Sequence, residues 1–543
     1  MPPIVLMAQS HQPVNPPLRI VLPTTPLASV SQESALPPRR QLLPGLAGYS
    51  IAPGLCLGPG RSQSARATTG EQDRVTLRED IRPLVQLIEN TPRDRCFEQI
   101  AEQLRRGLPY RDFLAALYLA GIRNVNPQPP GFKFHCVFVI HAAHQMSLDA
   151  PAADRLMPLF WALDNFKISQ QQDANQGDFQ LQPVTGKLPS TQLAWREFRA
   201  AMEDWDAPRA DRAIVALVRN ASAHEIISGL WEYGARDYRN IGHKAIFVTN
   251  TWRTLQTIGW HHAEPALRSL VLGLLDYGQE EKVNGFAFED QTYRSNLRLA
   301  NTLSAQMITD RTGNATDPGP TKSLLALLRD SDNAVDVCQH LTDELQTKRC
   351  TPQQAWDAIH LAAGELMMRQ PGIFGIHTVT SSSALRYAYD TARERRTQGL
   401  LLLQAAGWMC QFRQFMADQK AGLNDTAIDQ LEPAEIDPAG PDSCQQIFAQ
   451  IGQDPPLAAT QAMSYATRNP LVSDFKRLGR NLIFRKATDA HDYKYAVSIF
   501  EDYHRVSPGW RPQMLATATY HLRGSTVPDS PLMNRARKVI DSI

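Results

Sequence analysis

The chain has 543 residues, of which 43% are hydrophobic and 20% charged, and its 56 Lys and Arg nearly balance its 55 Asp and Glu. This composition is typical of a globular protein, and the charge balance gives no reason to expect nucleic acid or an anionic membrane as a partner. Seven widely spaced cysteines without a CxxC pair, and the lack of any apolar run of about 18 residues, argue against a disulfide framework, a zinc ribbon and a transmembrane helix.

Residues 1–70 differ from the rest of the chain because they are rich in Pro, Ser, Gly and Gln and lack periodicity. We predict a disordered leader there, followed by one helical domain over 75–543. Arg39-Arg40 precedes a weakly apolar run that ends at Leu57 and resembles a twin-arginine export signal. Prolines interrupt this run and it begins late, so we expect a cytoplasmic protein, with export by this signal as the alternative.

From residue 75 onward, apolar residues recur at helical spacing and strand signals are scarce. We therefore predict an all-α fold, one large multi-helix domain with any site buried among its helices. The clearest predicted helices cover 112–122, 151–165, 193–204, 209–218, 244–260 and a long, largely unbroken 381–418. Another helix begins at Pro352 with Thr351 as its N-cap. Loops are predicted over 127–130, 170–190, 311–320 and 430–443.

Standard catalytic motifs are absent. The sequence has no GxGxxG after a strand, no GxxxxGK[ST], no GxSxG and no HExxH. This argues against a standard nucleotide or flavin site, an α/β-hydrolase and a zincin.

Histidines in four separate stretches are the main functional signal, because helices of a bundle can build a metal site from inward-facing side chains. The first stretch, 134–144, holds His135, His141 and His144. His141 and His144 are three residues apart and share one side of a helix, whereas His135 points elsewhere. Each is equally compatible with a structural histidine in the core or at the surface.

The second stretch begins at His243, with Asn250 seven residues further on and Arg253 three beyond that. Asn250 returns to the same helix face, where a polar group can orient a metal-bound imidazole. A polar helix start gives the same pattern. The third stretch centres on His377, whose small hydroxylated neighbours suit close helix packing or, alternatively, an N-terminal cap by Thr380 or Ser381.

The fourth stretch places His491 and Lys494 three residues apart, on one helix face. Lys494 lies between Tyr493 and Tyr495, ahead of an apolar run. If this face is buried, the lysine must be paired, neutral or modified, and a lysine carboxylated by carbon dioxide becomes an anionic oxygen ligand. The alternative is a lysine that extends past the tyrosines to solvent.

Three of these stretches together resemble the questin oxidase-like family. Residues 243–255, HKAIFVTNTWRTL, are similar to the family's His-Gly-Leu-Ile-Arg helix with its later His-Ala-x-Arg-x-Leu. Lys244 replaces the glycine and Asn250 the second histidine, while Arg253 and Leu255 are kept. Residues 377–380, HTVT, resemble His-x-Val-Thr, and 489–494, DAHDYK, resemble Asp-Glu-His-x-x-Lys.

The resemblance implies a helical oxygenase that uses dioxygen on a polycyclic aromatic or quinone-type substrate, by ring cleavage or a Baeyer–Villiger-like reaction. It implies non-haem Fe(II) held by four histidines and a carboxylated lysine, or an NADPH-dependent monooxygenase. By this resemblance the ligands are His243, His377, His491, carboxylated Lys494, and one of His135, His141 and His144. Catalytic or pocket roles fall to Asn250, Arg253 and Tyr493, with Trp252 and Tyr495 as further pocket candidates. The alternatives are a metal-dependent hydrolase that uses the same site and a non-catalytic helical interaction protein.

Overall fold

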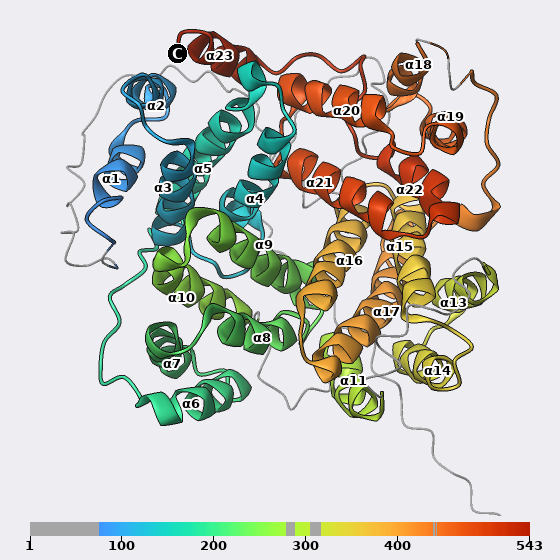
Figure 1. The fold of residues 1–543 in the computed structure, drawn as a ribbon, viewed down its shortest axis with the longest axis horizontal. Helices are drawn as coiled ribbons and strands as arrows, with labels where there is room; N and C mark the ends of the chain where they lie inside the picture. Colours follow the sequence, from blue (N-terminus) through green and yellow to red (C-terminus); the bar gives the residue numbers. More distant parts are fainter. Residues whose placement is uncertain (1–74, 76, 278–287, 304–316, 438–439, 441) are drawn as a thin grey trace, which may run out of the picture. The chain divides into compact units, whose positions relative to one another are not determined.

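The computed structural model describes residues 75, 77–277, 288–303, 317–437, 440 and 442–543. All regular secondary structure in these ranges is helical, which confirms the predicted all-α class. The described residues from 75 onward pack as one body (Figure 1). The predicted leader over 1–70, with its twin arginine, lies outside the described residues. None of the described helices is both long enough and apolar enough to cross a membrane.

The first half of the body contains ten α-helices in the described ranges. They are α1 (Arg82–Asn90), α2 (Cys96–Arg105), α3 (Tyr110–Asn124), α4 (His135–Leu148), α5 (Met157–Asn175), α6 (Thr191–Glu203), α7 (Ala207–Asn220), α8 (Ala223–Gly234), α9 (His243–Ile258) and α10 (Ala263–Leu274).

The described part of the second half continues the same pattern. Its helices are α11 (Gln291–Thr302), α13 (Gly319–Asp330), α14 (Ala334–Gln346), α15 (Pro352–Arg369), α16 (Ile373–Thr391), α17 (Arg395–Ala417), α18 (Ser443–Gln450), α19 (Pro455–Arg468), α20 (Ser473–Lys486), α21 (Ala490–Arg505), α22 (Arg511–Ala518) and α23 (Pro531–Ile540). The predicted start of α15 is confirmed, since Thr351 and Gln354 form a reciprocal capping box ahead of Pro352.

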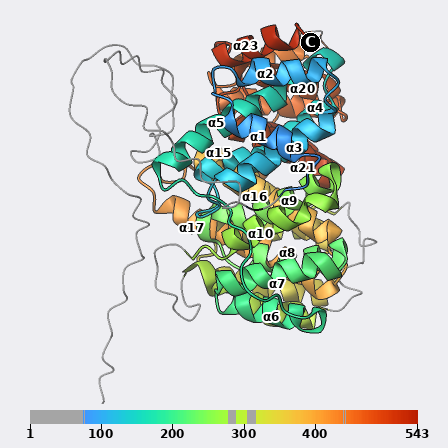
Figure 2. The same cartoon turned by 90° about the vertical axis from the view of Figure 1, so that its left-hand side faces the viewer.

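Four helices from distant parts of the sequence form a bundle at the middle of the body (Figure 1). α4 packs against α9, α9 against α16, α16 against α21, and α21 against α4. Viewed from the side, α9, α16 and α21 lie at mid-height, between α2 and α23 at one end and α6 and α7 at the other (Figure 2). Other helices therefore flank this bundle at both ends.

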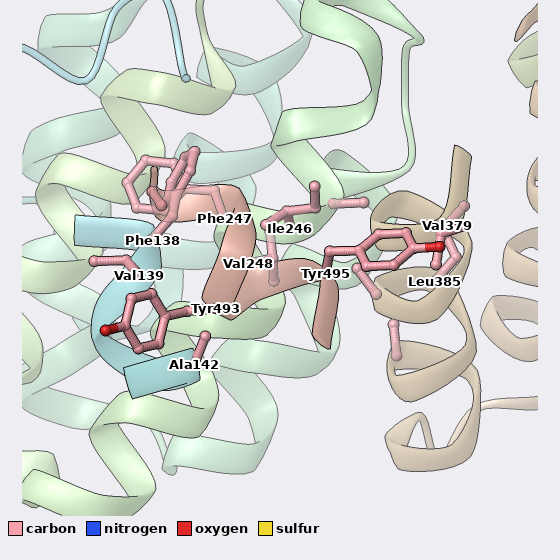
Figure 3. Packing of buried hydrophobic residues seen from close by; sticks show 14 of the residues in the cluster. Phe138, Val139, Ala142, Ile246, Phe247, Val248, Val379, Leu385, Tyr493 and Tyr495 are labelled. Atoms are coloured by element: carbon pink, nitrogen blue, oxygen red, sulfur yellow. The ribbon is translucent and has the colours of Figure 1, made fainter. Parts of the chain in front are cut away.

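Aromatic side chains fill the joints of the bundle. Phe138 of α4 and Phe247 of α9 pack with ring centroids 5.1 Å apart (Figure 3). The ring of Phe134 lies 5.0 Å from that of Phe247. Tyr493 and Tyr495 leave α21 in opposite directions. Tyr493 points toward α4 (Figure 3), whereas the Tyr495 hydroxyl donates to the Thr517 carbonyl of α22 at 2.7 Å. Such rings bury large apolar areas and fix the spacing of the helices that they join.

Some predicted boundaries were wrong, and the helix predicted over 151–165 begins only at Met157. The segment 381–418 is not one helix, because α16 ends at Thr391 and α17 begins at Arg395. The exposed charged residues between them reverse the chain at the surface, and Gln398 donates hydrogen bonds to the carbonyls of Tyr389 and Ala392. The predicted loop 170–190 begins later than expected, since α5 continues to Asn175.

Candidate metal centre

One histidine from each helix of the bundle converges on a single point. His135, His243, His377 and His491 each bring a ring nitrogen within 4.8 Å of the others. The Nε2 atom of His243 lies 3.0 Å from that of His135 and 2.9 Å from that of His377. The structure therefore brings together the three predicted histidines of α9, α16 and α21, and selects His135 from the three candidates on α4.

The other ring nitrogen of each histidine faces a hydrogen-bond acceptor. Nδ1 lies 2.7 Å from the Phe132 carbonyl in His135, 2.6 Å from the Asn240 carbonyl in His243, and 2.7 Å from the Ile373 carbonyl in His377. In His491 it contacts a carboxylate oxygen of Asp489. Carbonyl and carboxylate oxygens only accept, so each Nδ1 carries a hydrogen and donates it.

Burial keeps three of the converging imidazoles neutral. It lowers the pKa of His135, His243 and His377 well below the ordinary value of 6.5, and the neighbouring groups of the cluster lower it further. A neutral imidazole with its hydrogen on Nδ1 has a lone pair on Nε2. The close Nε2 pairs therefore cannot be hydrogen bonds between the rings. Lone pairs held this close repel one another unless a cation lies between them.

The spacing suits a transition-metal ion. Two nitrogens bound at about 2.1 Å to one ion lie about 3.0 Å apart at right angles and about 3.4 Å apart at a tetrahedral angle. The observed 2.9 and 3.0 Å match the right-angled arrangement of five- or six-coordinate ions. Imidazole ligands suit iron, copper, nickel and zinc, so the donor set fits a metal without selecting one.

The backbone turn before His243 is strained, and this turn orients the imidazole ring of His243. Asn240, Ile241 and Gly242 are three successive residues with left-handed φ angles of 55°, 50° and 81°. A β-branched residue such as Ile241 adopts this region at a cost of roughly 1–3 kcal/mol. The turn presents the Asn240 carbonyl to Nδ1 of His243.

Buried ion pairs hold this turn in place. Arg239 binds Asp290 with two hydrogen bonds of 2.6 and 3.0 Å, and Asn240 donates to Asp276 at 2.8 Å. Lys244 is fully buried, and its Nζ donates to the Asp237 carboxylate at 2.8 Å and to the Asp276 carbonyl at 2.7 Å. Nothing in the local sequence pattern distinguishes Lys244 and Asp237 as a pair, because only the tertiary fold brings them together.

Lys494 is buried beside the centre. Its side chain is 3% exposed, and its Nζ has no hydrogen-bond partner in the described part of the chain. The Nζ lies 5.7 Å from the centroid of the Phe138 ring. Burial lowers the pKa of Lys494 to about 7, although Asp489 opposes the shift. A lysine that extends to solvent is therefore excluded, and a large fraction of this amine is neutral at pH 7.

A small cavity of about 30 Å³ lies between the same four helices. Residues six and seven positions after each converging histidine line it, namely His141, Ala142, Thr249, Asn250, Ser383, Ala384, Val497 and Ser498. Residues three positions after the histidines of α9, α16 and α21, Ile246, Thr380 and Lys494, also line it. The cavity therefore lies beyond the histidine cluster, toward the C-terminal ends of these helices.

Other predicted site residues lie at or near this cavity. His141 is buried, and neither ring nitrogen has a hydrogen-bond partner among the described residues. Asn250 donates to the Phe138 carbonyl at 3.0 Å. Arg253 binds Glu501 at 2.9 and 2.5 Å, and both line the cavity. This Arg253–Glu501 ion pair is partly exposed, so it lies on the solvent side of the cavity.

The remaining candidates lie elsewhere. His144 faces the Tyr110 hydroxyl, with its Nδ1 3.1 Å from that oxygen. Tyr493 packs its ring 4.9 Å from that of Trp161, so it faces away from the cavity wall. His377 lies inside α16 and not in a cap. Asp489 takes part in the site without having been singled out as a site residue, although its position two residues before His491 is a visible signal.

The chain matches no model of a known protein family, no curated protein sequence and no solved structure. The interpretation of the site therefore depends on its geometry and chemistry.

Gly131 provides a test of how closely the His243 ring is held. It has φ 115°, and a Cβ atom added there would lie 3.0 Å from Cε1 of His243. We expect Gly131→Ala to displace the ring and weaken metal binding about 10- to 100-fold, as disturbed ligand shells do. Cobalt titration of chelator-treated protein, followed by visible absorption, measures this. Gly107→Ala is the control, since Gly107 has φ 93° with nothing within 4 Å of the added atom. Equal affinities in the two variants would contradict this close packing.

The neutral histidines predict a pH dependence of stability in the metal-free protein. Their folded-state pKa values are lowered, so below pH 6.5 the unfolded chain binds protons that the folded chain does not. Stability is therefore complete above pH 6.5 and falls below it, by up to about 1.4 kcal/mol per pH unit for each histidine. Thermal unfolding midpoints between pH 7.5 and pH 5.5 should fall less in His377→Gln than in His340→Gln, because His340 is 48% exposed. The same loss in both variants would show that the cluster does not titrate in this way.

Proposed function

We propose that the protein is a metal-dependent oxygenase with a non-haem Fe(II) centre held by His135, His243, His377 and His491. The observation that supports this most directly is the convergence of four imidazoles whose other nitrogens all face acceptors. When bound there, iron supplies the redox chemistry that allows dioxygen to react with an organic substrate. The protein's own part is to orient the ligands, exclude water and place the substrate.

We further propose that Lys494 becomes a carboxylated, anionic ligand. Four neutral imidazoles leave the charge of a divalent ion uncompensated. His135, His243 and His491 also lie in the first turn of their helices, where the helix dipole is positive. An anionic oxygen is therefore favoured, and the buried amine with a pKa of about 7 is suited to form one.

The carboxylation balances without a further reagent. The neutral Nζ of Lys494 attacks the carbon of carbon dioxide, a nitrogen–carbon bond forms, and one carbon–oxygen π bond opens to leave a carboxylate. The nitrogen releases one proton to water. The product has the negative charge that the site lacks, and its carboxylate would offer an oxygen ligand to the ion.

The substrate proposed from the family resemblance is an aromatic or quinone-type molecule. Such a molecule can enter only if the side chains around the cavity move. Ligand pockets for such molecules usually measure about 300–1,000 Å³, whereas the cavity measures about 30 Å³. The Arg253–Glu501 ion pair is the partly exposed part of its wall, so separation of this pair is the natural route of access. Asn250 and Ser383 would then contact the substrate. Assays with and without NADPH decide whether the reaction needs it.

A metal-dependent hydrolase is the second candidate. The cavity is lined largely by polar side chains and is large enough for one or two water molecules, since a water needs about 10–15 Å³. The same imidazoles bind zinc, and zinc activates water. A structural interaction protein is the candidate that this geometry favours least, because such a role does not require the four histidines to meet.

Metal analysis tests the proposal. Protein purified without added metal, then loaded anaerobically with Fe(II), should retain one ion per chain. His243→Ala and His377→Ala should lose it, while His144→Ala should keep it because His144 lies outside the cluster. Oxygen-electrode assays with hydroxylated aromatic compounds and quinones, with and without NADPH, should show uptake with iron and none with zinc. No retained metal would refute the proposal, and activity with zinc alone would favour the hydrolase.

Replacement of Lys494 tests the anionic ligand. Lys494→Ala should lose most of its bound metal, and added acetate should restore part of it by supplying the missing carboxylate. ¹³C NMR with labelled bicarbonate should show a carbamate signal in the unaltered protein and none in the variant. Lys167→Met is the control, because Lys167 is also buried but donates to the carbonyls of Ile88 and Glu89. Unchanged metal content in Lys494→Ala would refute this role.

A further inference from the structure

Only one of the four converging histidines has a negatively charged partner. His135, His243 and His377 donate from Nδ1 to neutral main-chain carbonyls, whereas His491 donates to the carboxylate of Asp489. A carboxylate partner raises the basicity of a ligating imidazole more than a carbonyl does. The four ligands are therefore chemically unequal, although they look alike in the sequence.

We propose that Asp489 is the positioning residue that makes His491 the most electron-rich imidazole of the centre and thereby tunes its metal affinity and reduction potential. This inference rests on the proposed function. In this proposal the negative charge of Asp489, and not only its hydrogen bond, acts on the bound metal through His491.

The helix cap of α21 holds this carboxylate in place. Asp489 is the N-cap residue, and its Oδ1 accepts from the backbone nitrogen of His491 at 2.8 Å as well as from the ring. Asp492 completes the capping box by accepting from the backbone nitrogens of Thr488 and Asp489 at 2.9 and 3.1 Å. Both hydrogen bonds from His491 end on one oxygen, so the cap fixes the direction of the ring.

A buried arginine, Arg523, binds residues of this helix cap. Arg523 contacts the carboxylate of Asp492 and donates to the Thr488 hydroxyl at 2.5 Å. Asp492 is therefore already neutralised by Arg523, while Asp489 has no such ion pair with an arginine or lysine in the described residues. The charge of Asp489 is left to act on His491, the ligand that it contacts.

Asp489 also lies at the edge of the buried centre. Its side chain is 55% exposed, whereas that of His491 is 9% exposed. A carboxylate in this position keeps its charge because water solvates its outer side, while its inner oxygen contacts the ligand. Water screens this charge, so its effect on the metal bound through His491 is moderate. A variant that changes only the charge is needed to measure it.

Two substitutions separate charge from geometry. Asp489→Asn keeps a good N-cap and an oxygen that can accept from His491, but it removes the charge. Asp489→Ala removes both. Asp454 is the matched control, because it is the N-cap of α19, accepts from the Leu457 nitrogen at 3.1 Å and lies outside the centre. Asp454→Asn and Asp454→Ala report what loss of a helix cap does by itself.

The experiment uses full-length protein loaded with Fe(II), and measures the reduction potential by spectroelectrochemistry and the affinity by competition with a chelator. Asp489→Ala should bind metal about 10- to 100-fold more weakly, and both Asp489 variants should have a higher reduction potential, because loss of negative charge disfavours the ferric state. The Asp454 variants should change neither property. A reduction potential in Asp489→Asn equal to that of the unaltered protein would overturn the charge effect, and unchanged affinity in Asp489→Ala would overturn the positioning role. Failure of the unaltered protein to bind metal would instead refute the proposed function, and this inference with it.

Discussion

The meeting of four imidazole lone pairs is the constraint on which the rest of the structure depends. Each Nε2 can face the others only if its Nδ1 carries the hydrogen, and this requires an acceptor behind every ring. Three of these acceptors are main-chain carbonyls that lie three or four residues before the histidine in sequence. The local backbone must therefore turn in a particular way ahead of His135 and His243, which explains the positive φ of Gly131 and the strained turn at 240–242. The buried pairs Arg239–Asp290 and Lys244–Asp237 hold that second turn, although none of these residues touches the centre.

A shared register joins the centre to the cavity. The histidines lie in the first turn of α4, α9 and α21 and in the second turn of α16, so the helices run away from the centre together. Positions six and seven after each histidine then face the same space two turns further on, at about 1.5 Å of rise per residue. The residues there are small or polar in all four helices apart from Val497, which leaves room between the helices. The position of each histidine in its helix thus determines both the histidine cluster and the place of the cavity.

The all-α fold could be predicted from helical periodicity, and the parts that could not be predicted have physical reasons. His243, His377, His491 and Lys494 were singled out as a set by the resemblance of short motifs to a known family, because spacing alone left a structural alternative open for each of them. The choice of His135 could not be predicted, because His141 and His144 share a helix face and made the more regular pair, whereas His135 depends on the turn before α4. The break between α16 and α17 was missed because no Gly or Pro marks it, and the charged residues 393–396 are Arg and Glu, which are good helix formers. Arg253 and Glu501 are 248 residues apart, so no local pattern predicts their ion pair.

The balance of charge around the centre explains why its polar neighbours differ from one another. Buried cations nearby are neutralised by specific partners, as Lys244 is by Asp237 and Arg523 by Asp492. Lys494 is the exception, since its amine is buried without a partner among the described residues. An unpaired buried amine costs free energy in every state in which it is charged. A metal with an anionic ligand at that position would remove this cost, and the neutral imidazoles would then complete the centre without adding charge. The unpaired lysine and the converging lone pairs are thus two parts of one electrostatic requirement, and a single bound cation with a carboxylated Lys494, as proposed, would satisfy both.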